Sequence, residues 1–387
     1  MTCTGSGHYH LGHGNVKTVQ NIVEDGSANS VSLVNEANQE FSFRLYRQLA
    51  ADADSQGKNI FFSPANVDQA FQRFLQRANN TSQEDASEGT SVFVDNGFKP
   101  KPEFLQTLKQ SYFTDVFNVD FSQATESADT INKYVEEKTN GKIDKLVENL
   151  DPSTVLYLIS YIYYKGKWAT PFDPKLTKQD DFNVDENTKV SVDMMNMEDR
   201  FYTYHDHDLN MTVLQLPFNS SYSMLLMLPD AMATLENAIS PNHITKWLKA
   251  MTRPRRLDVY IPKFSIKSSY NLNDVLSETG MTDMFGGRAN LRGISEEQGL
   301  AVSDVVHKAT LDVDETGAQA SAATGIGIGR SAFPAPAPVW KFNRQFMVII
   351  AECNREKFLF LGKIINPTIR WIITLCLFEH SCCISYK

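Results

Sequence analysis

The glycines at 325, 327 and 329 come closest to a known chemical motif in this sequence. A glycine-rich turn can bring backbone N–H groups close to a dinucleotide, provided that a strand precedes it and a helix follows directly. Here a proline-rich stretch, Pro334 to Pro338, follows instead, so we expect no nucleotide site. The sequence also lacks the H-E-x-x-H, G-x-S-x-G, Walker and C-x-x-C patterns. We therefore expect a protein that is not an enzyme and that needs no cofactor.

Histidines and cysteines offer little further chemistry. His8, His10 and His13 could contact a metal, but they lie in a polar, glycine-rich segment, which favours a tail over a metal site. Of the five cysteines, only Cys353 lies away from the two ends of the chain. A disulfide framework is therefore not expected.

The stretch from Glu315 to Pro338 carries two conflicting patterns. With a period of two, one side is mostly apolar, comprising Ala318, Ala320, Ala322, Thr324, Ile326 and Ile328. This alternation is typical of a strand half-buried in a sheet. The glycines and prolines of the same stretch indicate an exposed loop. The segment therefore has a sequence suited to two states.

The strand before this stretch and one earlier strand must position it. Residues 302–313 alternate and place His307 on an apolar face. Residues 155–164 are almost continuously apolar and are broken only by Ser160. Such a run predicts a strand covered on both faces, in the middle of a sheet.

The remaining patterns predict a mixed α+β fold in one domain with large, mostly antiparallel sheets. Helices are expected at residues 31–50, 67–75, around 131–135 with a stop at Asn140-Gly141, at 244–251 and at 272–276. Strands are expected at 59–64, 91–95 and 257–266, with hairpins at 211–217/223–229 and 346–351/358–365. The polar residues 79–87 are expected to form a loop.

Charge and hydropathy exclude two classes of partner. The net charge of −9, with a pI near 5.4, argues against binding to a phosphate backbone. No stretch approaches the roughly 20 apolar residues of a membrane span, so we expect no membrane partner. N-glycosylation sequons occur at Asn79, Asn80, Asn210 and Asn219.

Several motifs, in order, resemble those of the serpin family, within it the alpha-one antitrypsin group. They are Asn59-Ile-Phe-Phe-Ser-Pro64, Gly166-Lys-Trp168, Pro171-Phe-Asp-Pro174, Val306-His-Lys-Ala309, Asp314-Glu-Thr-Gly317 and Phe358-Leu-Phe-Leu-Gly-Lys-Ile-Ile-Asn-Pro367. The resemblance covers about residues 30–370 and implies one domain with three β-sheets and about nine helices. A disordered tail over 1–29 and a tail outside the family pattern over 371–387 are then expected.

The resemblance implies an inhibitor of serine proteases, with the stretch after Glu315 as its exposed reactive-centre loop. A protease cuts the loop and forms an acyl-enzyme, and the freed upstream half then adds to the main sheet as a strand. Small, uncharged residues are needed at the hinge that enters first, because a buried charge would cost several kcal/mol. The hinge residues are Glu315, Gly317, Ala318, Ala320 and Ala322, of which the three alanines must turn inward and meet this requirement.

Within this loop, two neighbouring bonds compete as the cleavage site. Counting from Glu315 by the usual length in the family places the reactive residue at about Ser331. The chemistry favours Arg330-Ser331, because the buried carboxylate of a trypsin-like pocket recognises arginine. Cleavage at Ser331-Ala332 would suit only an elastase-like pocket. We therefore predict Arg330-Ser331 and a trypsin-like target.

Other family positions carry over singly. His307 and Ser160 match the shutter, beneath the point where the sheet opens. Ser160 stands where the family has asparagine, and its hydroxyl can still donate one hydrogen bond. Trp168 and Lys263, with Glu315, match the breach, where the loop first enters. The resemblance also implies a secreted glycoprotein, with Asn219 at a family glycosylation position, although the N-terminus lacks a signal-peptide pattern.

Two departures leave three functional hypotheses open. After Pro64 the chain passes directly to residues that resemble the later part of the family's third helix, and residues 371–387 add an apolar, cysteine-bearing tail. The chain is then a secreted inhibitor, a non-inhibitory carrier or hormone-binding serpin, or a splice or gene-model variant unable to inhibit. The alanine-rich hinge favours the first, whereas the gap after Pro64 favours the last. We expect a monomer that is prone to polymerise.

Overall fold

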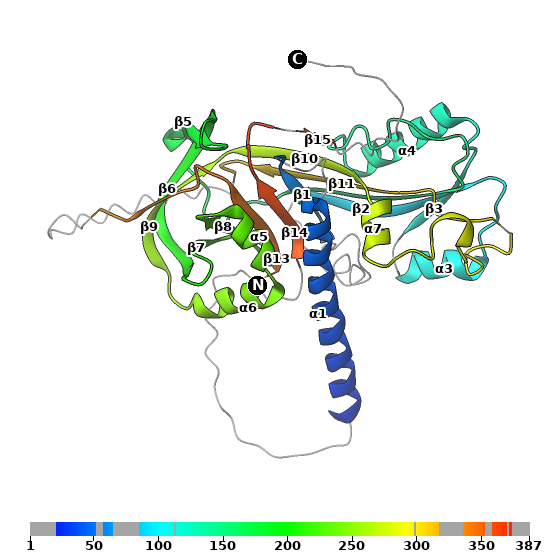
Figure 1. Cartoon of the computed structure of the whole chain (residues 1–387), viewed down its shortest axis with the longest axis horizontal. Helices are drawn as coiled ribbons and strands as arrows, with labels where there is room; N and C mark the ends of the chain where they lie inside the picture. The colour runs from blue at the N-terminus through cyan, green and yellow to red at the C-terminus, as the bar shows by residue number, and fades with distance from the viewer. Residues whose placement is uncertain are drawn as a thin grey trace.

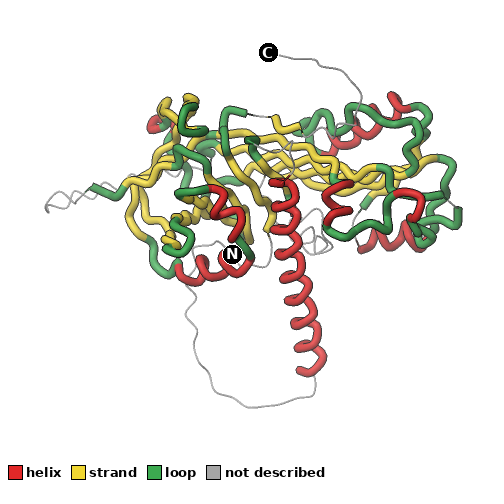
Figure 2. Tube along the Cα trace, in the orientation of Figure 1, coloured by secondary structure: helices red, strands yellow, loops and turns green. Residues whose placement is uncertain are grey.

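The computed structural model describes residues 21–51, 57–64, 85–111, 114–297, 299–316, 336–352, 358–369 and 371–373. Within these ranges the strands form two hydrogen-bonded sheets, one of six strands and one of nine. Helices cover the outer sides of the sheets, and α1 extends away from the body (Figures 1 and 2). The fold is of the α+β class, as predicted.

The six-stranded sheet is built from distant parts of the chain. Its order is β15 (Trp371–Ile373), β10 (Phe264–Asn271), β11 (Asp304–Val313), β4 (Leu156–Lys165), β2 (Asp85–Asp95) and β3 (Asp115–Val119). β10 and β11 are antiparallel, whereas β11 and β4 are parallel. The predicted strand at 155–164 therefore lies inside the sheet, as its apolar sequence indicated.

The nine-stranded sheet consists of two parts that meet in one long strand. Its order is β1 (Ile60–Phe62), β14 (Phe358–Ile364), β13 (Phe346–Glu352), β8 (Tyr222–Pro229), β7 (Met211–Pro217), β6 (Lys189–Asp206), β9 (Arg255–Pro262) and β12 (Val339–Lys341), with β5 (Lys178–Asn183) also on β6. In β6, residues up to Phe201 pair with β9 and those from Tyr202 pair with β7. The expected three sheets are thus present, two of them joined through β6.

Helices occupy the spaces outside the sheets. Their bounds are α1 (Asn21–Ala51), α3 (Pro102–Ser111), α4 (Ala124–Lys138), α5 (Met232–Ala238), α6 (Pro241–Ala250) and α7 (Asn273–Glu278), with short 3-10 turns at η3 (Pro174–Leu176) and η4 (Gly286–Arg288). Beyond α4, Asn140 and Gly141 both have positive φ, the left-handed geometry that ends a helix. None of the described helices is long and apolar enough to span a bilayer.

Side chains of β4 contribute to three separate cores, two of which cover most of its opposite faces. Ile162 and Tyr164 pack between the two sheets with residues such as Phe360. Ile159 and neighbouring tyrosines of β4 pack instead against α4, where Ile131 and Val135 are buried. Another core lies between the nine-stranded sheet and helices α1, α5 and α6. The β4 strand is therefore covered on both faces, as its sequence predicted.

Three boundaries differ from expectation. Residues 21–29, expected in the N-terminal tail, are helical because α1 begins at Asn21. β2 begins at Asp85, inside the expected loop 79–87. The single strand expected at 257–266 is wrong: it is two strands, β9 and β10, in different sheets. The break follows Pro262, because the chain there leaves one sheet and enters the other.

A buried polar cluster joins α1, α5 and β14. The Glu236 carboxylate accepts a hydrogen bond of 2.5 Å from the Tyr46 hydroxyl and lies 2.7 Å from Lys363 Nζ. Burial, followed by the nearby Glu236 charge, raises the pKa of Tyr46 well above its usual value. The three side chains therefore depend on one another for hydrogen-bond partners.

We expect Glu236→Val to lower the free energy of unfolding by roughly 2 to 4 kcal/mol, because it leaves the Lys363 ammonium and the Tyr46 hydroxyl without their shared acceptor. Urea titration at neutral pH measures this change. The matched control is Glu296→Val, since Glu296 pairs with Lys101 at an exposed position. That control is expected to cost less than about 1 kcal/mol. Equal losses in both variants would contradict the prediction.

Candidate functional site

The centre of the six-stranded sheet is a seam between two parallel strands. β4 and β11 pair over eight positions, from Asp304↔Tyr157 to Leu311↔Tyr164. A strand that followed β11 through a tight turn would run antiparallel to it. β10 already occupies the other side of β11, so the free position for such a strand lies between β11 and β4. The segment after Thr316 therefore begins where a new strand could enter the sheet if the seam separated.

Glu315 is held at the end of this seam by two side chains. Its carboxylate accepts a 2.8 Å hydrogen bond from Thr177 Oγ1 and lies 2.8 Å from Lys263 Nζ. Burial alone would raise the pKa of Glu315, but the hydrogen bonds from Lys263 and Thr177 outweigh it, so the pKa is lowered. The hydrogen bond with Glu315 and, to a smaller extent, the charge of its carboxylate raise the pKa of Lys263. Glu315 is thus ionised and paired at neutral pH.

Trp168 holds the backbone on either side of Glu315. Its Nε1–H donates to the Asp314 carbonyl at 2.7 Å, and its backbone N–H donates to the Thr316 carbonyl at 3.2 Å. The indole stacks on Phe218 with ring centroids 4.6 Å apart. Asp314 also pairs with Lys165, at the end of β4, over 2.6 Å. The structure therefore brings together Trp168, Lys263 and Glu315, which we call the breach cluster.

His307 lies beneath the middle of the seam and is completely buried. Its Nε2 accepts a 3.0 Å hydrogen bond from the Ser63 backbone N–H, and its Nδ1 lies 3.1 Å from Ser160 Oγ. Burial lowers the pKa of His307 from 6.5 to about 3. The ring is therefore neutral, and the proton must be on Nδ1 because Nε2 accepts.

This tautomer fixes the direction of the contact with Ser160. Towards His307 the hydroxyl accepts a hydrogen bond from Nδ1–H, which leaves its own proton available for donation. His307 and Ser160 are also register partners in the parallel pair of β11 and β4. Their contact, which we call the shutter pair, thus crosses the seam and links both strands to Ser63, next to β1. Separation of the strands would break it.

Comparison with known proteins identifies this arrangement. Residues 65–367 match the family model described as "Serpin (serine protease inhibitor)". The chain belongs to the serpin family. An alpha-1-antitrypsin homolog of Cyprinus carpio is 42% identical over 282 residues, which cover 72% of this chain and 75% of that protein. An alpha-1-antitrypsin-like protein of Tamias sibiricus is 37% identical over 367 residues, covering 85% of this chain and 87% of that protein.

Solved structures agree with the sequence relatives. Human thyroxine-binding globulin, solved in complex with thyroxine, superimposes with a TM-score of 0.79 and 30% identity, covering 88% of this chain and 100% of that chain. The resemblance to the serpins of the alpha-one antitrypsin group, inferred from the motifs, is therefore confirmed. Inhibition of proteases is the general activity that the family description and the names of these relatives support.

The loop positions of this serpin lie outside the described residues. These are Gly317, Ala318, Ala320 and Ala322 of the hinge and Arg330 and Ser331 of the predicted reactive bond; the sequons at Asn79 and Asn80 lie outside as well. Their roles stay predictions from the sequence.

The two described sequons occupy different settings. Asn210 is exposed in the turn between β6 and β7, has φ of 46°, and donates from its side chain to Asp230. Asn219 is partly buried, and its backbone N–H donates to the Lys167 carbonyl at 2.7 Å, beside the breach cluster. The exposed turn at Asn210 is therefore the more open of the two positions.

Sequence reasoning missed several partners of the predicted residues. Thr177 and Lys165 bind the acidic residues at the top of the seam, and Ser63 fixes the His307 tautomer. Lys308 is almost fully buried, and its Nζ donates to the Lys145 carbonyl. No local signal marks Thr177 or Lys165, because each contacts a residue more than a hundred positions away.

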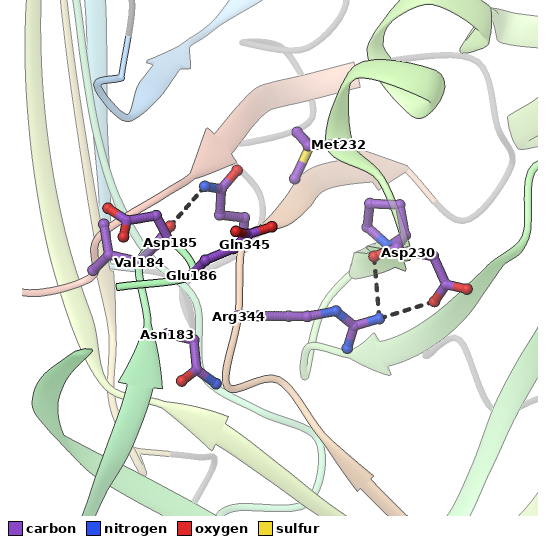
Figure 3. A pocket seen from close by; sticks show the side chains of 9 residues that line it. Asn183, Val184, Asp185, Glu186, Asp230, Met232, Arg344 and Gln345 are labelled. Carbon is purple, nitrogen blue, oxygen red and sulfur yellow. Dashed lines mark hydrogen bonds and ion pairs between the residues drawn. The ribbon is translucent and has the colours of Figure 1, made fainter. Parts of the chain in front are cut away.

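A surface pocket of about 400 Å³ lies just before β13, where Arg344 and Gln345 face the β5–β6 turn and the end of β8 (Figure 3). Arg344 donates to the Pro229 carbonyl at 3.1 Å and contacts Asp230, while Gln345 donates to the Val184 carbonyl at 2.7 Å. These contacts tie β8, β13 and the β5–β6 turn together. The residues that line this pocket therefore have a structural role, and they lie apart from the seam.

For the breach cluster we expect a favourable coupling of about 0.5 to 1.5 kcal/mol between Lys263 and Glu315, because their charge pair is partly shielded from solvent. A double-mutant cycle with Lys263→Met and Glu315→Gln, followed by urea unfolding, measures it. The pair Lys189 and Asp181, 3.9 Å apart and exposed, provides the control cycle. A coupling in the breach cluster no larger than in this control would show that the contact contributes nothing to stability.

Proposed function

We propose that this serpin inhibits trypsin-like serine proteases by cleavage of its reactive loop, trapping of the acyl-enzyme and insertion of the cut loop between β4 and β11. The observation that carries the proposal is the closed parallel seam with the loop origin at its end. A strand that continued from Thr316 antiparallel to β11 would find hydrogen-bond partners on both sides, so insertion would add two rows of ladder bonds.

The chemistry of the trapped state follows from the predicted bond. The hydroxyl of the protease serine attacks the carbonyl carbon of Arg330, and the Arg330-Ser331 bond breaks. Ser331 leaves with a free amine, having taken up a proton, and Arg330 stays as an ester on the protease. Insertion of residues 317–330 then has to outpace hydrolysis of that ester, because hydrolysis would release an intact protease.

Two further parts of the proposal concern its setting. The sequons, including exposed Asn210, support a secreted glycoprotein with its target outside the cell. The acidic charge of the chain supports a protein partner over a nucleic acid. We propose that the chain acts as a monomer that forms a one-to-one complex with the protease.

Incubation with trypsin, followed by denaturing electrophoresis and mass spectrometry, tests the proposal. We expect a covalent complex that survives denaturation, together with a released C-terminal fragment that begins at Ser331. Arg330→Ala should abolish complex formation with trypsin. A fragment beginning at Ala332 or later would overturn the assigned bond, and cleavage without any complex would show that this chain does not inhibit trypsin.

A second version of the protein, with the family's helical segment inserted after Pro64, tests the remaining hypothesis, namely that the gap after Pro64 makes the chain unable to inhibit. If the chain as written is cleaved without complex and the restored version forms the complex, the gap after Pro64 disables inhibition. If both form it, the remaining residues complete the fold without that segment.

A further inference from the structure

We propose that the segment beginning at Trp371 is a built-in edge strand that covers the open side of β10 and so prevents that edge from pairing with another copy of the chain. The observation is the parallel pairing of β15 with β10, in the register Lys267↔Trp371, Ser268↔Ile372 and Ser269↔Ile373. The family match ends at 367, before this strand. The inference does not rest on the proposed inhibitory function.

Without β15, β10 would be the last strand of the six-stranded sheet. Exposed edge strands present unpaired N–H and C=O groups, which natural proteins protect with charges, prolines, bulges or a cover. β10 pairs with β11 over eight positions with no register shift, so no bulge interrupts it. Its sequence contains no proline and a single charge, Lys267. Lys267 is therefore the only such device in the sequence of β10, and β15 adds a cover along three positions of the strand.

The path of the chain after the end of β14 brings β15 to this edge. Asn59 accepts hydrogen bonds from the backbone N–H groups of Ile365 and Asn366, and its side chain donates to the Asn366 carbonyl at 2.7 Å. Asn59 immediately precedes β1, and β1 lies against β10: the Ser268 hydroxyl donates to the Phe61 carbonyl, and the Tyr270 hydroxyl accepts from the Phe61 N–H. The fixed exit at Asn366 is therefore close to β10, and a few residues suffice to reach it, so we assign the covering strand to the same chain.

The cover does not obstruct the seam. β15 binds β10 on the side away from β11, whereas the seam lies between β11 and β4. Movement of β10 and β11 away from β4 would carry β15 along without breaking its pairing. Protection of the outer edge is thus compatible with an opening at the centre of the sheet.

A disulfide trap tests the assignment to the same chain. In a variant with all native cysteines replaced by serine, Ser269→Cys and Ile373→Cys occupy register partners, within reach of a disulfide. We expect oxidation to give a monomer with an internal bridge. The matched control, Ser265→Cys with Ile373→Cys, is four residues out of register, about 13 Å, and should not bridge. A bridge between two copies, no bridge in the first pair, or equal bridging in both pairs would overturn the assignment.

A truncation after Ile369 tests the protective role. We expect those backbone amides among Lys267 to Ser269 that face β15 to exchange with deuterium at least about tenfold faster, while the amides of β10 that face β11 and those of β4 stay unchanged. Light scattering on a size-exclusion column should show concentration-dependent dimers in the truncated chain and monomers in the full chain. Ile372→Pro, which removes a strand N–H without shortening the chain, should reproduce both effects, with Ile372→Val as its control. Unchanged exchange in β10, or a truncated chain that stays monomeric, would overturn the proposal.

Discussion

Ala320→Arg is expected to convert the chain from an inhibitor of trypsin into a substrate of trypsin. Ala320 lies on the apolar side of the alternation after Glu315. If that side turns into the sheet on insertion, arginine would have to bury a charge at a cost of several kcal/mol. Hydrolysis of the acyl-enzyme would then outpace insertion. The covalent complex should fall by at least about tenfold in yield, and cleaved chain should accumulate instead.

The neighbouring residue supplies the control. Gln319 lies on the opposite side of the alternation, so Gln319→Arg would keep its charge in solvent and should still form the complex. The two variants carry the same charge at adjacent positions. If both trap trypsin, or if only Gln319→Arg fails, the alternation is not the insertion register.

Acidification is expected to destabilise the chain through His307. Burial holds the pKa of the folded ring at about 3, whereas the unfolded chain takes up a proton near 6.5. Between these values the unfolded state binds more protons, so stability falls as the pH drops below about 6.5. The loss attributable to this ring is about 2 kcal/mol by pH 5 and approaches about 5 kcal/mol near pH 3.

Urea unfolding of the full chain and of His307→Gln between pH 7.5 and pH 5 measures this effect. The variant is expected to start lower by roughly 1 to 3 kcal/mol, because it disturbs the contacts with Ser63 and Ser160. It should then lose about 2 kcal/mol less than the unaltered chain over this range. Carboxylates with lowered pKa values, such as Glu315, lose their contribution only at lower pH. Parallel pH profiles for the two chains would contradict the prediction.

Local patterns predicted the elements whose buried side chains form a continuous apolar run or a clear hairpin. The continuous apolar run at β4 and the hairpins β7–β8 and β13–β14 were found where the sequence placed them. β11 was only partly predicted, because its alternation suggested one buried face. Val306, Lys308 and Thr310, on the other face, are buried as well. A lysine at such a position predicts a face exposed to solvent. Lys308 is buried instead because the carbonyl of a distant residue, Lys145, accepts its hydrogen bond.

The site residues also divide into those that the sequence predicted and those that it did not. Family motifs pointed to Trp168, Lys263, Glu315, His307 and Ser160, and the structure places them in two clusters at the end and the middle of one seam. Thr177 and Ser63 could not be predicted, because their roles arise from contacts across the fold and leave no spacing in the sequence. The split between β9 and β10 was missed because Pro262-Lys263 separates two runs with the same apolar alternation.

The pairing of β1 with β14 has a consequence for synthesis on the ribosome. Asn59 contacts Ile365 across 306 positions of the chain, and Ile60 pairs with Lys363. At translation rates of about 5 to 20 residues per second, β1 would wait about 15 to 60 s for this sheet partner to be made. During that time Phe61 and Phe62 would have no completed core to enter. In the nascent chain, β1 therefore cannot take its place in the sheet until β14 has been made. This interval is a natural point for chaperone binding.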